Sequence, residues 1–315
     1  MEQHLDLNTN QVKLNRVGFG VSPQDLEKLD LEKDWTNTQK ILKDVKRILI
    51  VACGTSSYAG QIGKYYFETI AKIPTEVDIA SEFRYRNPVF TDNMLVITIS
   101  QSGETADTLA AIRLAKEAKV QTLSISNVRN STIDREASGH LYLNSGPEIG
   151  VASTKAFTST ITILQCLALA LGKSQGSLSS KTEEEHVQAL LALPSHIESV
   201  LGFDKYFSQA ANELKNFKGF LYIGRGVNFP IALEGALKLK ELAYYHAEGY
   251  AAGEMKHGPL ALIDANMAIV VVAPDDNLFE KTVSNLEEAK ARGGKIISIG
   301  TGDNKRLNSI SERYL

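Results

Sequence analysis

The sequence has few cysteines and little net charge. Only Cys53 and Cys166 occur among its 315 residues, which is too few for a disulfide framework, and their spacing fits no metal site. The formal net charge is -3 and no long basic run is present, so the composition predicts binding neither to nucleic acid nor to an anionic membrane. A small-molecule ligand is therefore the default expectation.

The chain also lacks the sequence features of targeting. Its N-terminus, MEQHLDLNTNQ, has neither the basic nor the apolar region of a signal peptide, and its apolar stretches are judged too short to span a bilayer. We therefore expect a cytoplasmic protein. With 43% hydrophobic residues, the chain has material for a large core and, by its length, for about two lobes.

A nucleoside triphosphate motif is missing, but one turn has the composition of a phosphate site. Residues 95–115 read LVITISQSGETADTLAAIRLA, which predicts a buried strand, a turn and a helix. Hydroxyl and amide side chains at a helix N-terminus favour an anion. The turn has no Lys or Arg and no Walker pattern, so a phosphate monoester is expected rather than a nucleotide with Mg²⁺. In the alternative interpretation, Ser102 and Thr105 merely cap the helix.

The order of apolar runs indicates an internal duplication. The strand pattern Ile48 to Gly54 recurs at Phe220 to Gly226, and the pattern Leu95 to Ser102 recurs at Ala268 to Asp276. We expect an α/β protein of two duplicated lobes, each a mainly parallel sheet flanked by helices. The expected division is a lead-in at 1–45, a first lobe at 46–182 and a second lobe at 183–315, with the Ser- and Gly-rich stretch 173–182 as the linker.

The two lobes are expected to differ in ligand binding. In the second lobe, Pro274-Asp275-Asp276 replaces the hydroxyl-rich turn, and its carboxylates would repel a phosphate. We therefore expect the phosphate site in the first lobe alone. A further loop, residues 146–155, precedes a long apolar helix predicted at 156–171 and could also touch the ligand.

The second lobe carries a candidate chemical site on a helix predicted at 232–248. Glu234, Lys238 and Glu241 are spaced i, i+4 and i+7, so they share one helix face, although such a stripe can also be merely solvated. The following segment, 246–259, is dense in Gly, Glu and His and is expected to form a loop rather than core. His246 and His257 lack a tight metal-binding spacing, so zinc is not expected, while a histidine is a plausible proton carrier.

Several motifs together resemble one known family. They are ACGTSSYAG, EFRYR, TISQSGETADT, EIGVASTKAFT, GRGVNFPIALEGALKLKE and HAEGYAAGEMKHGPLALID. They resemble the isomerase domain of the glutamine:fructose-6-phosphate amidotransferases, which consists of two sugar isomerase (SIS) subdomains, and the resemblance covers about Arg47 to Gly300. It implies a ketose-aldose isomerase that acts on fructose 6-phosphate and forms glucosamine 6-phosphate or glucose 6-phosphate for amino-sugar synthesis, with no cofactor.

The resemblance also assigns roles to individual residues. It implies that the phosphate is held by Ser100, Gln101, Ser102 and Thr105, and that the sugar is lined by Thr55, Ser56, Val151 and Ser153. Glu241 matches the base that moves a proton between C1 and C2, and Lys238 and Glu234 match helper positions. His257 matches a residue that assists ring opening and reaches the neighbouring subunit's site, which implies a homodimer.

The chain departs from the family pattern at both ends. The family's glutaminase domain begins with a cysteine at its amino end, whereas position 2 here is Glu2, so the amino group is expected from ammonia or from a separate glutaminase. The family's C-terminal tail with its Schiff-base lysine is not expected in a second lobe that stops at Leu315. Lys155 and Lys238 are the nearest candidates for an imine. A non-catalytic SIS-type module that binds or senses a phosphosugar is the alternative function.

Overall fold

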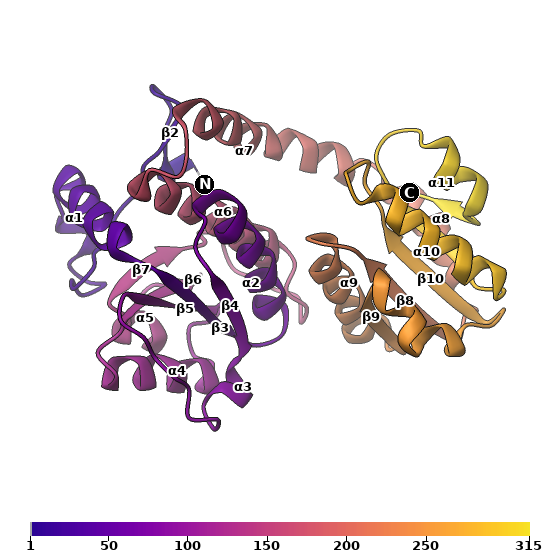
Figure 1. The fold of residues 1–315 in the computed structure, drawn as a ribbon, viewed down its shortest axis with the longest axis horizontal. Helices are drawn as coiled ribbons and strands as arrows, with labels where there is room; N and C mark the ends of the chain where they lie inside the picture. The colour runs from indigo at the N-terminus through magenta and orange to yellow at the C-terminus, as the bar shows by residue number, and fades with distance from the viewer. Residues whose placement is uncertain (1) are drawn as a thin grey trace. The chain divides into compact units, whose positions relative to one another are not determined.

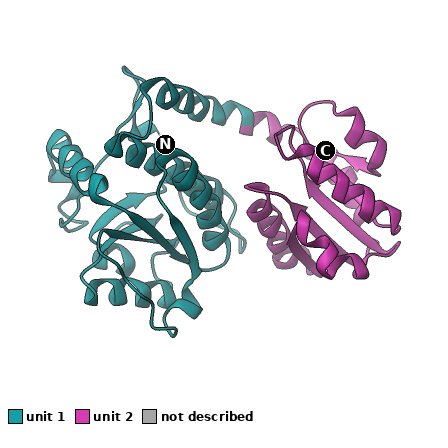
Figure 2. Ribbon diagram, in the orientation of Figure 1, with its two compact units in different colours: residues 1–196 teal, residues 197–315 magenta. Residues whose placement is uncertain are grey.

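The computed structural model describes residues 2–315 and consists of two compact units (Figure 2). Unit 1 ends at His196 and unit 2 begins at Ile197. Both positions lie within helix α7 (Ser180–Leu201), whereas the sequence placed the boundary between residues 182 and 183. Each unit contains one five-stranded parallel sheet.

The sheet of unit 1 has the strand order β4-β3-β5-β6-β7 (Figure 1). All seven residues of the central strand β5 are buried, and the neighbouring β3 is buried from Ile48 onward. Strands covered on both faces need continuous rather than alternating hydrophobicity, which explains the apolar runs in the sequence. The strands are β3 (Arg47–Ala52), β4 (Thr75–Ile79), β5 (Met94–Ser100), β6 (Gln121–Ser126) and β7 (Gly139–Tyr142).

Helices cover both faces of this sheet. Side chains of β3 alternate between two cores: Ile48 and Ile50 pack with α1, α2 and α6, whereas Leu49 and Val51 pack with α3 and α4. The short α5 packs beside α4 through Ile133. The helices are α1 (Leu31–Asp44), α2 (Gly54–Tyr66), α3 (Ala80–Phe83), α4 (Ala106–Glu117), α5 (Thr132–Glu136) and α6 (Lys155–Gln175).

The predicted lead-in is an integral part of unit 1. Its hairpin of β1 (Leu5–Asp6) and β2 (Gln11–Val12) and its helix α1 bury Val12 and Leu42 completely in the same core as α6. The backbone N–H of Val12 also donates to Glu183 Oε1 at 2.8 Å. These contacts join the first and last elements of the unit.

Helix α6 corrects two expectations. It runs on to Gln175 and ends at Gly176, whose φ of 72° terminates the helix, so only residues 176–179 separate it from α7 in the stretch predicted as a linker. By length and composition, α6 is also the one helix among the described residues that could cross a membrane, whereas the sequence analysis judged every apolar stretch too short. Because 67% of its apolar window is buried inside unit 1, its role as a core helix accounts for that composition.

Unit 2 repeats the topology of unit 1 and confirms the duplication. Its strand order, β9-β8-β10-β11-β12, corresponds position by position to β4-β3-β5-β6-β7. The strands are β8 (Gly219–Gly224), β9 (Ala247–Ala251), β10 (Met267–Val272), β11 (Lys295–Ile299) and β12 (Arg313–Tyr314). The helices are α8 (Asp204–Leu214), α9 (Asn228–Ala243), α10 (Phe279–Ala291) and α11 (Lys305–Ile310).

The helix predicted at 232–248 has different ends in the structure. It begins earlier, at Asn228, because Gly224 permits a tight turn in which a Cβ atom would lie 2.2 Å from the carbonyl oxygen of Asn228. It ends at Ala243, and the following segment pairs with β8 as strand β9. The segment predicted as a loop outside the core therefore contains a strand, and both Ala252 and Met255 are fully buried. Pairing at the sheet edge outweighs the helix propensity of this sequence.

Candidate functional site

The candidate phosphate site lies at the switch point of unit 1, which is the place between β3 and β5 where the strand order reverses. Strand β3 is followed in the chain by β4 on one side, and β5 lies on its other side. Ala52 pairs with Ile99, so the chain leaves both strands at the same level of the sheet. The turns 53–57 and 100–105 therefore follow neighbouring strands at the carboxyl edge of the sheet, the position at which open parallel sheets bind ligands.

The turn after β5 is arranged around a buried hydroxyl. The Oγ atom of Ser100, whose residue is 2% exposed, lies 2.9 Å from Thr105 Oγ1 and accepts from the backbone N–H of Gly103 at 3.1 Å. Gln101 is half-buried and Ser102 is exposed, so their polar side chains remain accessible at the rim of the turn.

The alternative in which Ser102 and Thr105 cap α4 is not what the structure shows. Thr105 is the N-cap residue of α4, but its side chain accepts no capping hydrogen bond. Ser102 Oγ accepts from the N–H of Glu104, which precedes the helix. An anion can accept hydrogen bonds from the N–H groups in the first turn of a helix. At α4 these N–H groups lie beside the hydroxyls of the turn.

Glu104, the acidic residue of the turn, is bound elsewhere. Its Oε1 accepts from the backbone N–H of Thr132 at 2.8 Å, and this hydrogen bond holds the pKa of Glu104 below its usual range. Gly103 lies against the same segment: its φ is 68°, and a Cβ atom there would lie 1.9 Å from Ser131 Oγ. The beginning of α5 therefore holds both the Glu104 carboxylate and the backbone of the turn.

On the other side of the switch point, Thr55 and Ser56 occupy the first turn of α2. Both are half-buried, and the N-cap residue Cys53 makes no side-chain capping bond. Two helix N-termini, those of α2 and α4, thus follow the two strands at the switch point. The predicted phosphate residues and, of the predicted sugar-lining residues, Thr55 and Ser56 therefore follow the two strands at this switch point.

The loop before α6 has a partner that the sequence analysis missed. Glu148 accepts from Ser153 Oγ at 3.2 Å and from the N–H of Thr154 at 2.6 Å. Burial alone would raise the pKa of Glu148, but the N–H groups of Thr154 and Ala156 outweigh it and lower that pKa. Of the predicted sugar-lining residues, Ser153 is therefore bonded to Glu148, and Val151 is 95% exposed. The available signal in the sequence was an acidic residue seven positions before the first residue of α6.

In unit 2, α9 presents the predicted row of charged side chains. Lys238 Nζ lies 3.4 Å from Glu234 Oε1 and 2.5 Å from Glu241 Oε2. The Glu234 side chain is 7% exposed and that of Glu241 is 32% exposed. A solvated stripe would leave all three side chains in water, whereas here the Glu234 carboxylate is buried. The Glu241 carboxylate is the more accessible of the two. A carboxylate next to an ammonium group can accept and return a proton.

The remaining candidates of unit 2 lie outside this row. His257 is exposed at the end of the 3₁₀ turn Ala252–His257, and His246 Nε2 lies 3.5 Å from Glu248 Oε1. Lys155, in unit 1, is exposed in the first turn of α6. Within residues 2–315, no three His, Cys, Asp or Glu side chains are grouped to hold a metal ion.

At the switch point of unit 2, the carboxylate of Asp276 accepts the hydrogen bonds of nearby donors. Asp276 accepts from Asn228 Nδ2 at 3.3 Å and from the N–H of Leu278 at 2.8 Å. The second copy of the turn thus contains an internal anion, in contrast to the uncapped α4 of unit 1.

Comparisons with known proteins agree with this architecture. The family model of the SIS domain matches residues 41–170 and again residues 213–312. The glutamine–fructose-6-phosphate aminotransferase (isomerizing) of Bradyrhizobium diazoefficiens is 55% identical over 255 residues, which cover 81% of this chain and 42% of that protein. The chain spans about half the length of the curated relatives it matches, for example 48% of the one from Bordetella parapertussis.

Solved structures show the same fold. The C-terminal domain of glucosamine-fructose-6-phosphate aminotransferase from Francisella tularensis superposes with a TM-score of 0.85 at 43% identity, covering 89% of this chain and 79% of that one. A putative phosphosugar isomerase from Silicibacter pomeroyi shares the fold at a TM-score of 0.72 and 22% identity, over 90% of this chain and 84% of that one. The family resemblance drawn from the motifs is confirmed, and the chain belongs to the SIS domain family, with one SIS domain in each of its two units.

Proposed function

We propose that this chain binds a hexose 6-phosphate and interconverts ketose and aldose forms, as the isomerase part of an enzyme that makes glucosamine 6-phosphate from fructose 6-phosphate. The observation that carries the proposal is the uncapped N-terminus of α4 beside the Ser100 and Thr105 hydroxyls. The relatives from Bradyrhizobium and Francisella are fructose-6-phosphate aminotransferases, which supports the choice of sugar. A cytoplasmic location and ammonia as the source of the amino group belong to the same proposal.

The residue types suit the proposed reaction. Moving a proton between C1 and C2 of a ketose needs a base near those atoms and an anchor for the distant phosphate. We assign the phosphate to Ser100, Gln101, Ser102 and Thr105, the sugar to Thr55, Ser56, Val151 and Ser153, and the proton transfer to Glu241 with Lys238 and Glu234 beside it. His257 is assigned to ring opening.

Removing two hydroxyls of the turn is expected to weaken binding. Ser102→Ala combined with Thr105→Ala should raise the Kd for fructose 6-phosphate at least about tenfold, or about 1.4 kcal/mol. The reason is that the phosphate loses two donors at a helix N-terminus. Isothermal titration calorimetry measures the change.

The matched control removes two hydroxyls elsewhere in unit 1. Thr36 and Thr69 each bond only the carbonyl oxygen of the preceding helical turn and lie exposed on α1 and just after α2. The double variant Thr36→Ala, Thr69→Ala should bind normally. Equal affinity of wild type and the Ser102, Thr105 variant would show that the phosphate binds elsewhere.

The assignment of His257 to a neighbouring subunit's site predicts intersubunit complementation. Glu241→Gln and His257→Ala should each inactivate the homodimer. Random mixing of the two variants would give half heterodimers, each with one intact site, so about a quarter of wild-type activity should return. The mixture is assayed after subunit exchange, and the oligomeric state is measured by light scattering. Two inactive variants that recover nothing when mixed would rule out shared sites.

A further inference from the structure

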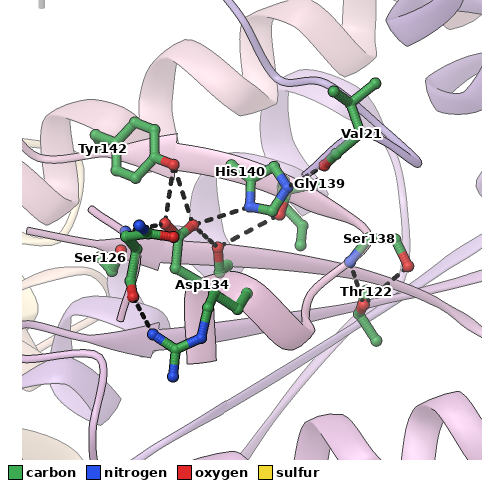
Figure 3. Close-up of polar contacts among 12 residues, drawn as sticks. Val21, Thr122, Ser126, Asp134, Ser138, Gly139, His140 and Tyr142 are labelled. Carbon is green, nitrogen blue, oxygen red and sulfur yellow. Dashed lines mark hydrogen bonds and ion pairs between the residues drawn. The ribbon is translucent and has the colours of Figure 1, made fainter. Parts of the chain in front are cut away.

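A buried polar cluster of Asp134, His140 and Tyr142 has no role in the proposed chemistry. Asp134 and His140 are completely buried, and Tyr142 is 6% exposed. His140 Nδ1 donates to Asp134 Oδ1 at 2.8 Å, and the Tyr142 hydroxyl donates to Asp134 Oδ2 at 2.9 Å (Figure 3). A buried carboxylate is costly without such partners, so the three side chains depend on one another.

The cluster connects α5 to the sheet and to the N-terminal segment. Asp134 lies on α5, whereas His140 and Tyr142 lie on β7. On its other side, His140 Nε2 lies 3.0 Å from the carbonyl oxygen of Val21 (Figure 3). Burial alone would raise the pKa of Asp134, but hydrogen bonds from His140 and from the N–H of Asn130 outweigh it and lower that pKa. These partners therefore favour the ionised carboxylate and hold it from several sides.

Helix α5 in turn holds the predicted phosphate turn. The N–H of Ile133 donates to the carbonyl oxygen of Gly103 at 3.0 Å, and the N–H of Thr132 donates to Glu104 at 2.8 Å. The segment before α5 adds a bond from the N–H of Asn127 to the carbonyl oxygen of Gln101 at 3.1 Å. A helix of five residues is not stable alone, so its position depends on what anchors it.

We infer that Asp134 is a positioning residue for the phosphate turn: its bonds to His140 and Tyr142 fix α5, and α5 fixes the backbone of residues 101–104. The inference rests on the proposed binding of a phosphosugar at this turn. Asp134 itself does not contact the phosphate. It acts by keeping the N–H and hydroxyl donors of the turn in place before the ligand arrives. Small displacements of such donors weaken ligand binding.

The test is Asp134→Asn. This substitution keeps the shape of the side chain but places an amide N–H₂ group against the donors of His140 and Tyr142. We expect the Kd for fructose 6-phosphate to rise about tenfold, with kcat at saturating substrate unchanged within about twofold. Hydrogen exchange, followed by mass spectrometry, should become at least about tenfold faster at the N–H groups of Asn127, Thr132 and Ile133. Leu42→Ala is the control because it destabilises the same unit from α1, on the opposite face of the sheet.

The outcomes separate the inference from the proposed function. A normal Kd and normal exchange in folded Asp134→Asn, or an equal rise of Kd in Leu42→Ala, would overturn the inference. If the wild type binds no fructose 6-phosphate, the proposed function fails, and the exchange rates alone then decide whether Asp134 fixes the turn. If Asp134→Asn does not fold, Tyr142→Phe replaces it, since it removes one donor to Asp134; a rise in Kd of about threefold supports the inference and no rise overturns it.

Discussion

Glu241→Gln is expected to slow the isomerisation of fructose 6-phosphate by roughly 10² to 10⁴ while leaving its Kd nearly unchanged. The substitution keeps the length and polarity of the side chain and its proximity to Lys238, which lies 2.5 Å from the carboxylate. It removes the negative charge that faces Lys238 and, with it, the ability to accept a proton from carbon. Turnover is measured by coupled assay of aldose phosphate, with and without ammonia, and Kd by calorimetry.

The control for this prediction is Glu287→Gln, on α10 of the same unit. Glu287 is likewise a helical glutamate beside a cation, with Arg306 Nη2 at 3.3 Å, and its side chain is 53% exposed. This variant should keep wild-type rates. Normal isomerisation by Glu241→Gln would place the base elsewhere, and joint loss of binding and turnover would make Glu241 a ligand-holding group. Binding of the sugar by the wild type without any turnover would favour a phosphosugar-binding module.

Gly103→Ala is expected to lower the free energy of unfolding of unit 1 by about 2–5 kcal/mol and to weaken fructose 6-phosphate binding more than tenfold. The left-handed φ of 68° disfavours any side chain, and the new Cβ would lie 1.9 Å from Ser131 Oγ and 2.4 Å from Ser131 Cβ. Either the phosphate turn or α5 must move. Urea denaturation followed by circular dichroism gives the stability, and calorimetry gives the affinity.

Gly176 supplies the matched control because its φ is 72° but no atom lies within 4 Å of the position that a Cβ atom would take. Gly176→Ala should therefore cost about 1–2 kcal/mol from backbone strain alone and leave binding intact. Adding Ser131→Gly to Gly103→Ala removes the steric conflict and should restore part of the loss. Equal costs at Gly103 and Gly176 would mean that the contact with Ser131 is unimportant.

The fold was predictable where local pattern and tertiary environment agree. The run Leu95 to Ile99 is apolar because β5 is covered on both faces, and the same pattern in unit 2 revealed the duplication. The row of Glu234, Lys238 and Glu241 followed from helical periodicity alone. The helix end at Ala243 was not predictable in this way, since the pairing of β9 with β8 takes over the next residues.

Parts of the candidate site were missed because their partners are defined by the folded chain. Nothing in the sequence near Asp134 points to His140 and Tyr142, whose side chains reach it from a neighbouring strand. Glu148 is visible as an acidic residue in a loop, but its bonds to Ser153 and Thr154 depend on how that loop folds back on α6. Polar partners of this kind lack a periodic signal.

The bond between Val12 and Glu183 sets an order of events during synthesis of the chain. Its two ends are 171 residues apart, so unit 1 lacks its closing contact until nearly all of the unit has been translated. At about 5–20 residues per second, the hairpin of β1 and β2 waits roughly 10 to 30 seconds for its partner. Within that interval, once the strands have been made and until α6 follows them, the sheet face that α6 later covers lacks its helix, and partly made chains of this kind are prone to aggregation and to capture by chaperones.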